Sequence, residues 1–325
     1  MKPLFKILLA VLVLLVVSAI GGYFYVRKQF RAPRNQLVVT QLPATSSFVW
    51  EADTTNQRAM PHAALLVPVL LPGCSRTCYL QFDTGAPYSV LYANSLAALR
   101  GQYPATANTL LPQADTVRHF RFALGQGQVQ ARAIRVMQRG ATQLPADSTA
   151  PFVIGTLGAD VLAKQVLVID YARRQFSLCS AVPDSLLRRA TYVPMSFDSR
   201  RVLLNVRLQG KPKQLLFDSG SSAFALLTSQ DAWHELARSA APARTAAVNS
   251  WGKTLTAHTV ATAAALQLGA LVVPLGTVTY IEGTSMWQEL LMRFSGMGGM
   301  LGNEPFVNQT VILDAPGGRF GVVQE

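Results

Sequence analysis

The sequence is poor in charged residues for its length. Of its 325 residues, 14% are charged and 50% are hydrophobic. This balance excludes a long disordered chain, because it leaves enough apolar material to build packed cores. At about 100 to 200 residues per domain, a chain of this length predicts two domains or lobes.

Acidic residues are scarce as well. The chain has 17 Asp and Glu against 29 Lys and Arg, which gives a formal net charge of +12. Residues 1 to 34 hold six of the basic residues and no acid, so the remainder carries only +6. No basic stripe interleaved with aromatic residues is present, and we therefore expect no nucleic-acid partner.

The residues that several catalytic classes need are missing. Three cysteines without a matching histidine cluster do not make a zinc site. Arg238 stands where a zinc-protease helix beginning at His234 would need its second histidine, and the other histidines, His62, His119 and His258, show no triad spacing. No Gly-x-Ser-x-Gly motif occurs. The sequence thus predicts neither a zinc site nor a serine-hydrolase triad.

A long hydrophobic run begins near the N-terminus. Ile7 to Tyr25 are nineteen uncharged residues bounded by Lys6 and Arg27, enough for a helix to cross about 30 Å of hydrocarbon. A cleaved secretory signal is the alternative, because small residues precede Ile20. We favour a retained single-pass membrane anchor in residues 1 to 34, since the apolar run continues beyond Ala19 and a basic cluster follows it. The basic residues on both sides leave the orientation open.

Two cysteines bracket a short loop after the anchor. Cys74 and Cys78 could close as a disulfide in an oxidising compartment, which favours a body outside the cytoplasm, periplasmic or extracellular. The alternative is that both are free thiols. Residues 35 to 60 are rich in Gln, Thr, Ala and Pro, a composition typical of a spacer between membrane and body.

The body contains two halves with the same order of landmarks. Each begins with a predicted hairpin whose second strand is apolar and ends in an aspartate. These strands deliver two similar triplets: Asp83-Thr84-Gly85 and Asp218-Ser219-Gly220. A second landmark follows in each half. Gly158 to Asp170 and Gly302 to Asp314 are both twelve residues, so we divide the body into lobe one (61–182), a connector (183–191) and lobe two (192–325).

Both lobes are predicted to be mainly β. Short Val, Leu and Ile runs separated by Gly, Pro or Gln turns dominate the pattern. Helices are expected at 93–100 and at 230–240, where Ser229 could cap the second one. A pseudo-two-fold axis between such lobes would bring equivalent loops together and place Asp83 and Asp218 face to face.

The duplicated body resembles the pepsin-like aspartic proteases, with retropepsin-like features in lobe one. The segments that carry the resemblance are "FDTGA" and "FDSGSS", together with the apolar-Gly elements Thr156 to Gly158 and Met300 to Gly302. The resemblance implies a two-lobed fold with pseudo-two-fold symmetry and a monomer, since both lobes lie in one chain. It also implies hydrolysis of a peptide or protein substrate without metal or organic cofactor.

The resemblance implies roles for the residues of both triplets. Asp83 and Asp218 would be the catalytic pair that shares one proton and activates a water molecule. Thr84 and Ser219 would brace the two loops across the lobe interface. Gly85 and Gly220 would shape the loops, and Ser221 would donate a hydrogen bond to the second aspartate.

Two features depart from the family pattern. The best candidate for the hairpin flap over the cleft has the turn Leu124-Gly125-Gln126-Gly127, which contains no tyrosine. Ala86 follows the first triplet where a serine is expected, and a missing hydroxyl donor stabilises the carboxylate less. We therefore expect activity at mildly acidic to neutral pH. The alternative function is a catalytically silent, two-lobed peptide- or protein-binding module of the cell envelope.

Overall fold

The computed structural model describes residues 14, 17, 18, 21, 22, 34–54, 59–250, 253–283 and 297–323. The chain divides into two compact units, Met1–Arg34 and Asn35–Glu325. In the first unit the five described residues before Arg34 are helical. The described residues include no helix that is both long and apolar enough to cross a membrane, and most of the predicted anchor lies outside them.

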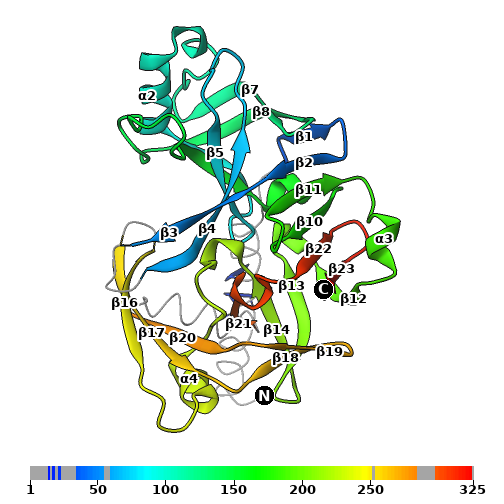
Figure 1. Cartoon of the computed structure of the whole chain (residues 1–325). Helices are drawn as coiled ribbons and strands as arrows, with labels where there is room; N and C mark the ends of the chain where they lie inside the picture. Colours follow the sequence, from blue (N-terminus) through cyan, green and yellow to red (C-terminus); the bar gives the residue numbers. More distant parts are fainter. Residues whose placement is uncertain are drawn as a thin grey trace, which may run out of the picture. The chain divides into compact units, whose positions relative to one another are not determined.

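The second unit is mainly β and is built on two sheets (Figure 1). The first sheet has the strand order β1-β8-β6-β9-β5-β4-β3, with β7 paired to β8. Its strands are β1 (Leu37–Thr40), β3 (Val49–Asp53), β4 (Met60–Val69), β5 (Cys78–Asp83), β6 (Val90–Tyr92), β7 (Thr116–Leu124), β8 (Gly127–Met137) and β9 (Val153–Gly158).

The second sheet contains β2, the last two strands of the first half and the strands of the second half. Its strands are β2 (Ala44–Ser47), β10 (Val166–Asp170), β11 (Gln175–Cys179), β12 (Thr191–Ser196), β13 (Leu203–Leu208), β14 (Lys211–Phe217), β15 (Leu226–Leu227), β16 (Arg244–Ser250), β17 (Lys253–Ala261), β18 (Ala265–Leu268), β19 (Leu271–Pro274), β20 (Thr277–Glu282), β21 (Met297–Leu301), β22 (Thr310–Asp314) and β23 (Arg319–Val323).

The helices that the structure describes in the second unit are short. The α-helices are α2 (Ala93–Gln102), α3 (Asp184–Leu187) and α4 (Gln230–Leu236), and the 3-10 turns are η1 (Pro104–Thr106), η2 (Ala159–Leu162), η3 (Asp198–Arg200), η4 (Ser219–Ser221) and η5 (Glu304–Phe306). Both predicted helices are present. Ser229 caps α4 by accepting a hydrogen bond from the Ala232 amide at 3.3 Å, and the helix ends four residues earlier than predicted.

The two halves repeat one pairing pattern. In the first half β5 lies parallel to β9, and β6 is antiparallel to β9 and parallel to β8. In the second half β14 lies parallel to β21, and β15 is antiparallel to β21 and parallel to β20. The buried side chains of β5 and β14 are apolar, which is why each of these strands can run through the interior. This arrangement is consistent with a two-lobed, pepsin-like fold.

Strands β10 and β22 meet at the centre of this duplication. They are antiparallel, and Val168 pairs with Ile312. Ile312 lies 144 residues after Val168, the same separation as between the landmarks Asp170 and Asp314. Val168 therefore pairs with its own counterpart, which is the register expected where a pseudo-two-fold axis crosses an antiparallel pair.

The prediction of a spacer over residues 35–60 is wrong. β1 pairs with β8, β2 with β11, and β3 with β4, so this segment contributes strands to both sheets. Ala44 and Phe48 are buried, and Phe48 contacts the Trp50 ring edge-on. These strands could not be recognised from the composition, because the segment is rich in small and polar residues and its few buried positions are separated by exposed ones.

Candidate active site

The predicted aspartates lie where two equivalent interior strands end. Asp83 is the last residue of β5 and pairs with Gly158 of β9. Asp218 directly follows β14, and its amide donates to the Leu301 carbonyl of β21 at 2.9 Å. Each aspartate is thus fixed by a neighbouring parallel strand that carries one of the apolar-Gly elements.

Two side chains cross between the halves directly behind these aspartates. The Thr84 amide donates to the Ser219 Oγ at 2.9 Å, and the Ser219 amide donates to the Thr84 Oγ1 at 2.9 Å. Each hydroxyl also donates to a carbonyl of the opposite half: Thr84 to Phe217 at 2.7 Å and Ser219 to Phe82 at 3.3 Å. Both residues are fully buried, so the four hydrogen bonds join the two loops in a dry environment.

The glycine of each triplet lies against the carboxylate of the other half. A Cβ placed on Gly85 would lie 2.5 Å from the Asp218 Oδ1, and one placed on Gly220 would lie 2.7 Å from the Asp83 Oδ2. Any side chain at either position would collide with a carboxylate. Glycine therefore allows the two loops to approach until the carboxyl groups of Asp83 and Asp218 form a hydrogen bond with each other.

The two carboxylates receive different donors within their own loops. The Asp83 Oδ1 accepts the amides of Gly85 at 2.8 Å and Ala86 at 3.1 Å. The Asp218 Oδ1 accepts the Gly220 amide at 2.9 Å, and its Oδ2 accepts the Ser221 hydroxyl, also at 2.9 Å. Only the second loop supplies a hydroxyl, as the contrast between Ala86 and Ser221 predicts.

Burial and the neighbouring Asp218 carboxyl raise the pKa of Asp83 to about 7. Desolvation is the largest cause, followed by the charge of Asp218 and the hydrogen bond that protonated Asp83 donates to it, while the amides of Gly85 and Ala86 act in the opposite direction. One carboxyl group of the pair is therefore neutral over the mildly acidic range. A neutral acid beside an ionised one can donate and accept protons at the same site.

The predicted flap is wrong. The β7–β8 turn lies against β2, because a Cβ on Gly127 would collide with the Ala44 side chain and one on Gly125 with the Thr45 backbone. Ala123, beside the turn, exchanges hydrogen bonds with Leu70, which follows β4. Leu70 adjoins the start of β5, about 17 Å along the strand from Asp83 at roughly 3.3 Å per residue. One face of the hairpin belongs to the core, and alternating buried residues signal this in the sequence: Phe120, Phe122, Leu124, Val129 and Ala131.

The cysteine loop contains free thiols. Cys74 and Cys78 are not bonded, and both Sγ atoms lie near the Arg76 carbonyl, at 3.4 Å and 3.8 Å. The predicted disulfide is therefore absent, and the alternative of two thiols holds. Burial raises the pKa of the Cys78 thiol above its ordinary value. Arg76 itself is buried and donates to the carbonyls of Asp147 at 3.0 Å and Ala150 at 2.7 Å.

Two buried polar residues behind the site were not predicted. Asn303 follows the apolar-Gly element of the second half, and its amide nitrogen donates to the Ser219 carbonyl at 3.3 Å and to the Ser222 Oγ at 2.9 Å. Tyr171 donates from its hydroxyl to the Asn303 Oδ1 at 2.7 Å. The only sequence signal was the position of Asn303 next to Gly302, and nothing in the sequence pairs it with Tyr171.

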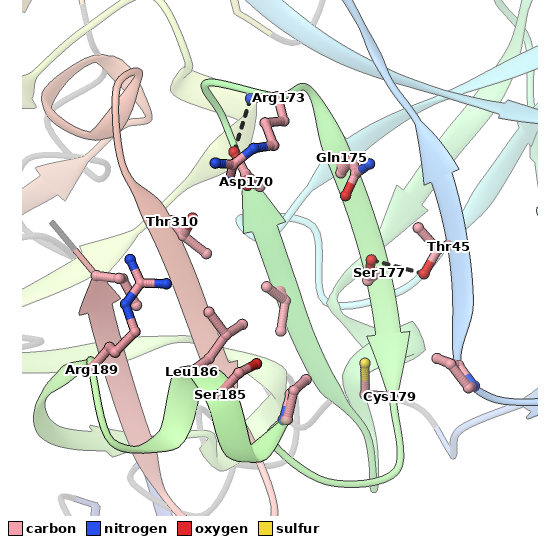
Figure 2. A pocket seen from close by; sticks show the side chains of 14 residues that line it. Thr45, Asp170, Arg173, Gln175, Ser177, Cys179, Ser185, Leu186, Arg189 and Thr310 are labelled. Carbon is pink, nitrogen blue, oxygen red and sulfur yellow. Dashed lines mark hydrogen bonds and ion pairs between the residues drawn. The ribbon is translucent and has the colours of Figure 1, made fainter. Parts of the chain in front are cut away.

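A separate hollow lies on the face of β10 and β11, beside α3 (Figure 2). Arg173 and Asp170 form an ion pair of 2.8 Å at one end of it, and Thr45 and Ser177 form a hydrogen bond of 3.0 Å on its floor. The hollow contains neither Asp83 nor Asp218.

Solved structures of known proteins include chains that are similar to this one. The chain is similar in structure to an aspartic proteinase from Irpex lacteus, with a TM-score of 0.45 and 14% sequence identity, over 88% of this chain and 97% of that one. No protein-family model matches the sequence, and no curated protein matches it.

Proposed function

We propose that the chain is an aspartic endopeptidase that hydrolyses peptide bonds with a water molecule activated between Asp83 and Asp218. The observation that carries this proposal is the hydrogen bond between the two carboxyl groups, supplied by equivalent strands of the two halves. Carboxylates this close share a proton, because both cannot be ionised at once.

The donors around the pair support a division of roles. Asp218 accepts the Ser221 hydroxyl and the Gly220 amide, which favour its negative charge, so we propose that it takes a proton from the attacking water. Asp83 has the raised pKa and would hold the shared proton, which it donates to the carbonyl oxygen of the scissile bond. The route is non-covalent, since the water and not a side chain attacks the peptide carbon. When the tetrahedral intermediate collapses, Asp218 gives its proton to the leaving amine nitrogen as the C–N bond breaks, and Asp83 takes back a hydroxyl proton.

The proposal extends to the setting of the reaction. The substrate is a peptide or protein, and one chain supplies both aspartates, so a monomer suffices. The hydrophobic run from residue 7 to residue 25 supports a membrane anchor.

Cleavage of a peptide mixture tests the proposed function. The full-length protein would be incubated with a mixed peptide library between pH 3 and pH 8, with and without pepstatin, beside the Asp83→Asn variant. We expect new peptide ends by mass spectrometry that both the inhibitor and the substitution abolish. If a folded protein releases no fragment across this pH range, the endopeptidase proposal fails and a silent binding module replaces it.

Adding a hydroxyl beside Asp83 should narrow the active pH range. In Ala86→Ser the new hydroxyl would donate to Asp83 as Ser221 donates to Asp218, and a donor to the ionised form lowers the pKa of Asp83. A hydrogen bond to a charged group corresponds to about one pH unit. We expect the alkaline limb of the pH–rate profile to move down by about that amount, with the acid limb unchanged. An alkaline limb at its wild-type position would show that Asp83 does not govern it.

A further inference from the structure

The backbone of the second aspartate loop is fixed from behind by one amide side chain. Asn303 is completely buried and donates to the Ser219 carbonyl and to the Ser222 Oγ. A carbonyl can only accept, so the nitrogen of the Asn303 side chain must face Ser219 and its oxygen must face the other way. The orientation of this side chain is thereby determined.

The Ser219 carbonyl belongs to the same peptide unit as the Gly220 amide. A peptide unit is planar and rigid, so holding its carbonyl oxygen also sets the direction of its N–H. That N–H donates to the Asp218 Oδ1 at 2.9 Å. Asn303 therefore acts on Asp218 through a single rigid unit, and its hydrogen bond to the carbonyl also polarises the N–H that Asp218 accepts.

Tyr171 holds Asn303 in this orientation. Its hydroxyl donates to the Asn303 Oδ1 at 2.7 Å, and burial raises the pKa of the phenol, so it remains a donor at every working pH. The Tyr171 ring is buried and stacks on Trp50 with 5.9 Å between ring centroids and 8° between planes. The donor is consequently fixed by packing as well as by its hydrogen bond.

The first half has no equivalent of this amide. The residue after Gly158 is Ala159, 144 residues before Asn303, and its methyl group cannot donate a hydrogen bond. The two aspartate loops thus differ at this position. The loop of Asp218, which has the buried amide behind it, is also the one that supplies a hydroxyl, from Ser221.

We propose that Asn303, held by Tyr171, is a positioning residue that keeps the Gly220 N–H directed at the Asp218 Oδ1 and so fixes the position of this carboxyl group beside Asp83. This inference rests on the proposed function for its kinetic consequence only. Its structural content, the direction and strength of the Gly220 hydrogen bond, can be measured in a protein that cleaves nothing.

The test compares Asn303→Ala, Asn303→Leu and Tyr171→Phe with the wild-type full-length protein. Asn303→Ala makes the second half like the first, and Asn303→Leu keeps nearly the same size but has no group that can donate a hydrogen bond. We expect kcat to fall about tenfold to a hundredfold in both, the range typical of residues that orient a reacting group, with little change in KM. Tyr171→Phe should show the same changes at smaller size.

The second readout is the amide proton shift of Gly220, measured by NMR on protein labelled with ¹⁵N-glycine. We expect an upfield shift in all three variants, since a weaker hydrogen bond deshields the proton less. Thr262→Val is the matched control: Thr262 is buried, bonds to the Leu236 carbonyl and the Ala264 amide, and contacts neither aspartate loop through these bonds. It should lower the melting temperature and leave both readouts unchanged.

The possible outcomes separate the two proposals. If Asn303→Ala melts earlier but keeps both kcat and the Gly220 shift, the residue is merely structural and the inference is overturned. If Asn303→Ala does not fold, the Gly220 shift in Tyr171→Phe decides the matter. If the wild type cleaves no peptide, the proposed function fails. A Gly220 signal that moves in the variants would still support the positioning role of Asn303, and one that does not move would still contradict it.

Discussion

Asp83→Asn should abolish cleavage and stabilise the fold at alkaline pH. The asparagine oxygen can accept the Gly85 and Ala86 amides as the aspartate does, and its nitrogen can donate to Asp218 as the protonated carboxyl does. The variant imitates the neutral form but can neither release nor take up a proton. We expect a loss of at least about a thousandfold in kcat/KM, which is within the range of general acid–base catalysis.

The stability change follows from the raised pKa of Asp83. The folded protein keeps this proton up to about pH 7, whereas the unfolded chain loses it near the ordinary value of 3.8. The folded state therefore binds more protons between these values, and its free energy of unfolding falls as the pH rises through them. Asparagine removes this dependence. The melting temperature of the variant should exceed that of the wild type at pH 8 and lie close to it at pH 4.

Thermal scans at the two pH values, with Asp218→Asn alongside, check this prediction. A variant that melts earlier than the wild type at pH 8 would mean that ionised Asp83 costs the fold nothing. Retained cleavage in Asp83→Asn would remove this residue from the reaction altogether.

Thr84→Val should separate the two aspartate loops. Valine has the shape of threonine but leaves the buried Ser219 amide and Phe217 carbonyl without their partner. Each unpaired buried group costs about 1 to 3 kcal/mol, so the substitution should cost about 2 to 6 kcal/mol of unfolding free energy. For a chain of this size that corresponds to a fall in melting temperature of about 5 to 15 °C. Activity should fall at least about tenfold, because the loops set the distance between the carboxyl groups.

Thr84→Ser is the matched control for this substitution. It keeps the hydroxyl that accepts from Ser219 and donates to Phe217 and loses only a methyl group. Its unfolding free energy should stay within about 1.5 kcal/mol of the wild type. Equal melting temperatures and equal cleavage rates for the valine and serine variants would show that the crossed hydrogen bonds do not hold the loops.

The sequence was informative where chemistry and repetition coincide. Two similar triplets on two predicted apolar strands were enough to expect Asp83 and Asp218 to meet, because a duplicated unit places equivalent loops at its axis. Local rules also predicted α2 and the capping of α4 by Ser229. These features depend on neighbours in the sequence or on symmetry between the halves, and both can be read without coordinates.

Features that depend on contacts between distant segments were misjudged. The β7–β8 turn has the glycines of a flap, but it packs on Ala44, a residue assigned to a spacer. The wrong flap and the wrong spacer are linked, since the β7–β8 hairpin packs against the segment from residue 35 to residue 53. The contact between Tyr171 and Asn303 joins residues 132 positions apart through one hydroxyl. A single hydrogen bond between two distant residues leaves no periodicity or motif in the sequence from which it could be predicted.

The proton shared by Asp83 and Asp218 is the centre of this account, and carboxyl titration by NMR measures it directly. Protein labelled with ¹³C at aspartate carboxyls would be titrated from pH 3 to pH 9, with Asp83→Asn and Asp218→Asn used to assign the pair. We predict one carboxyl signal that keeps its proton until about pH 7 and that disappears in Asp83→Asn. Two aspartates that both titrate near pH 4, independently of each other, would contradict the account.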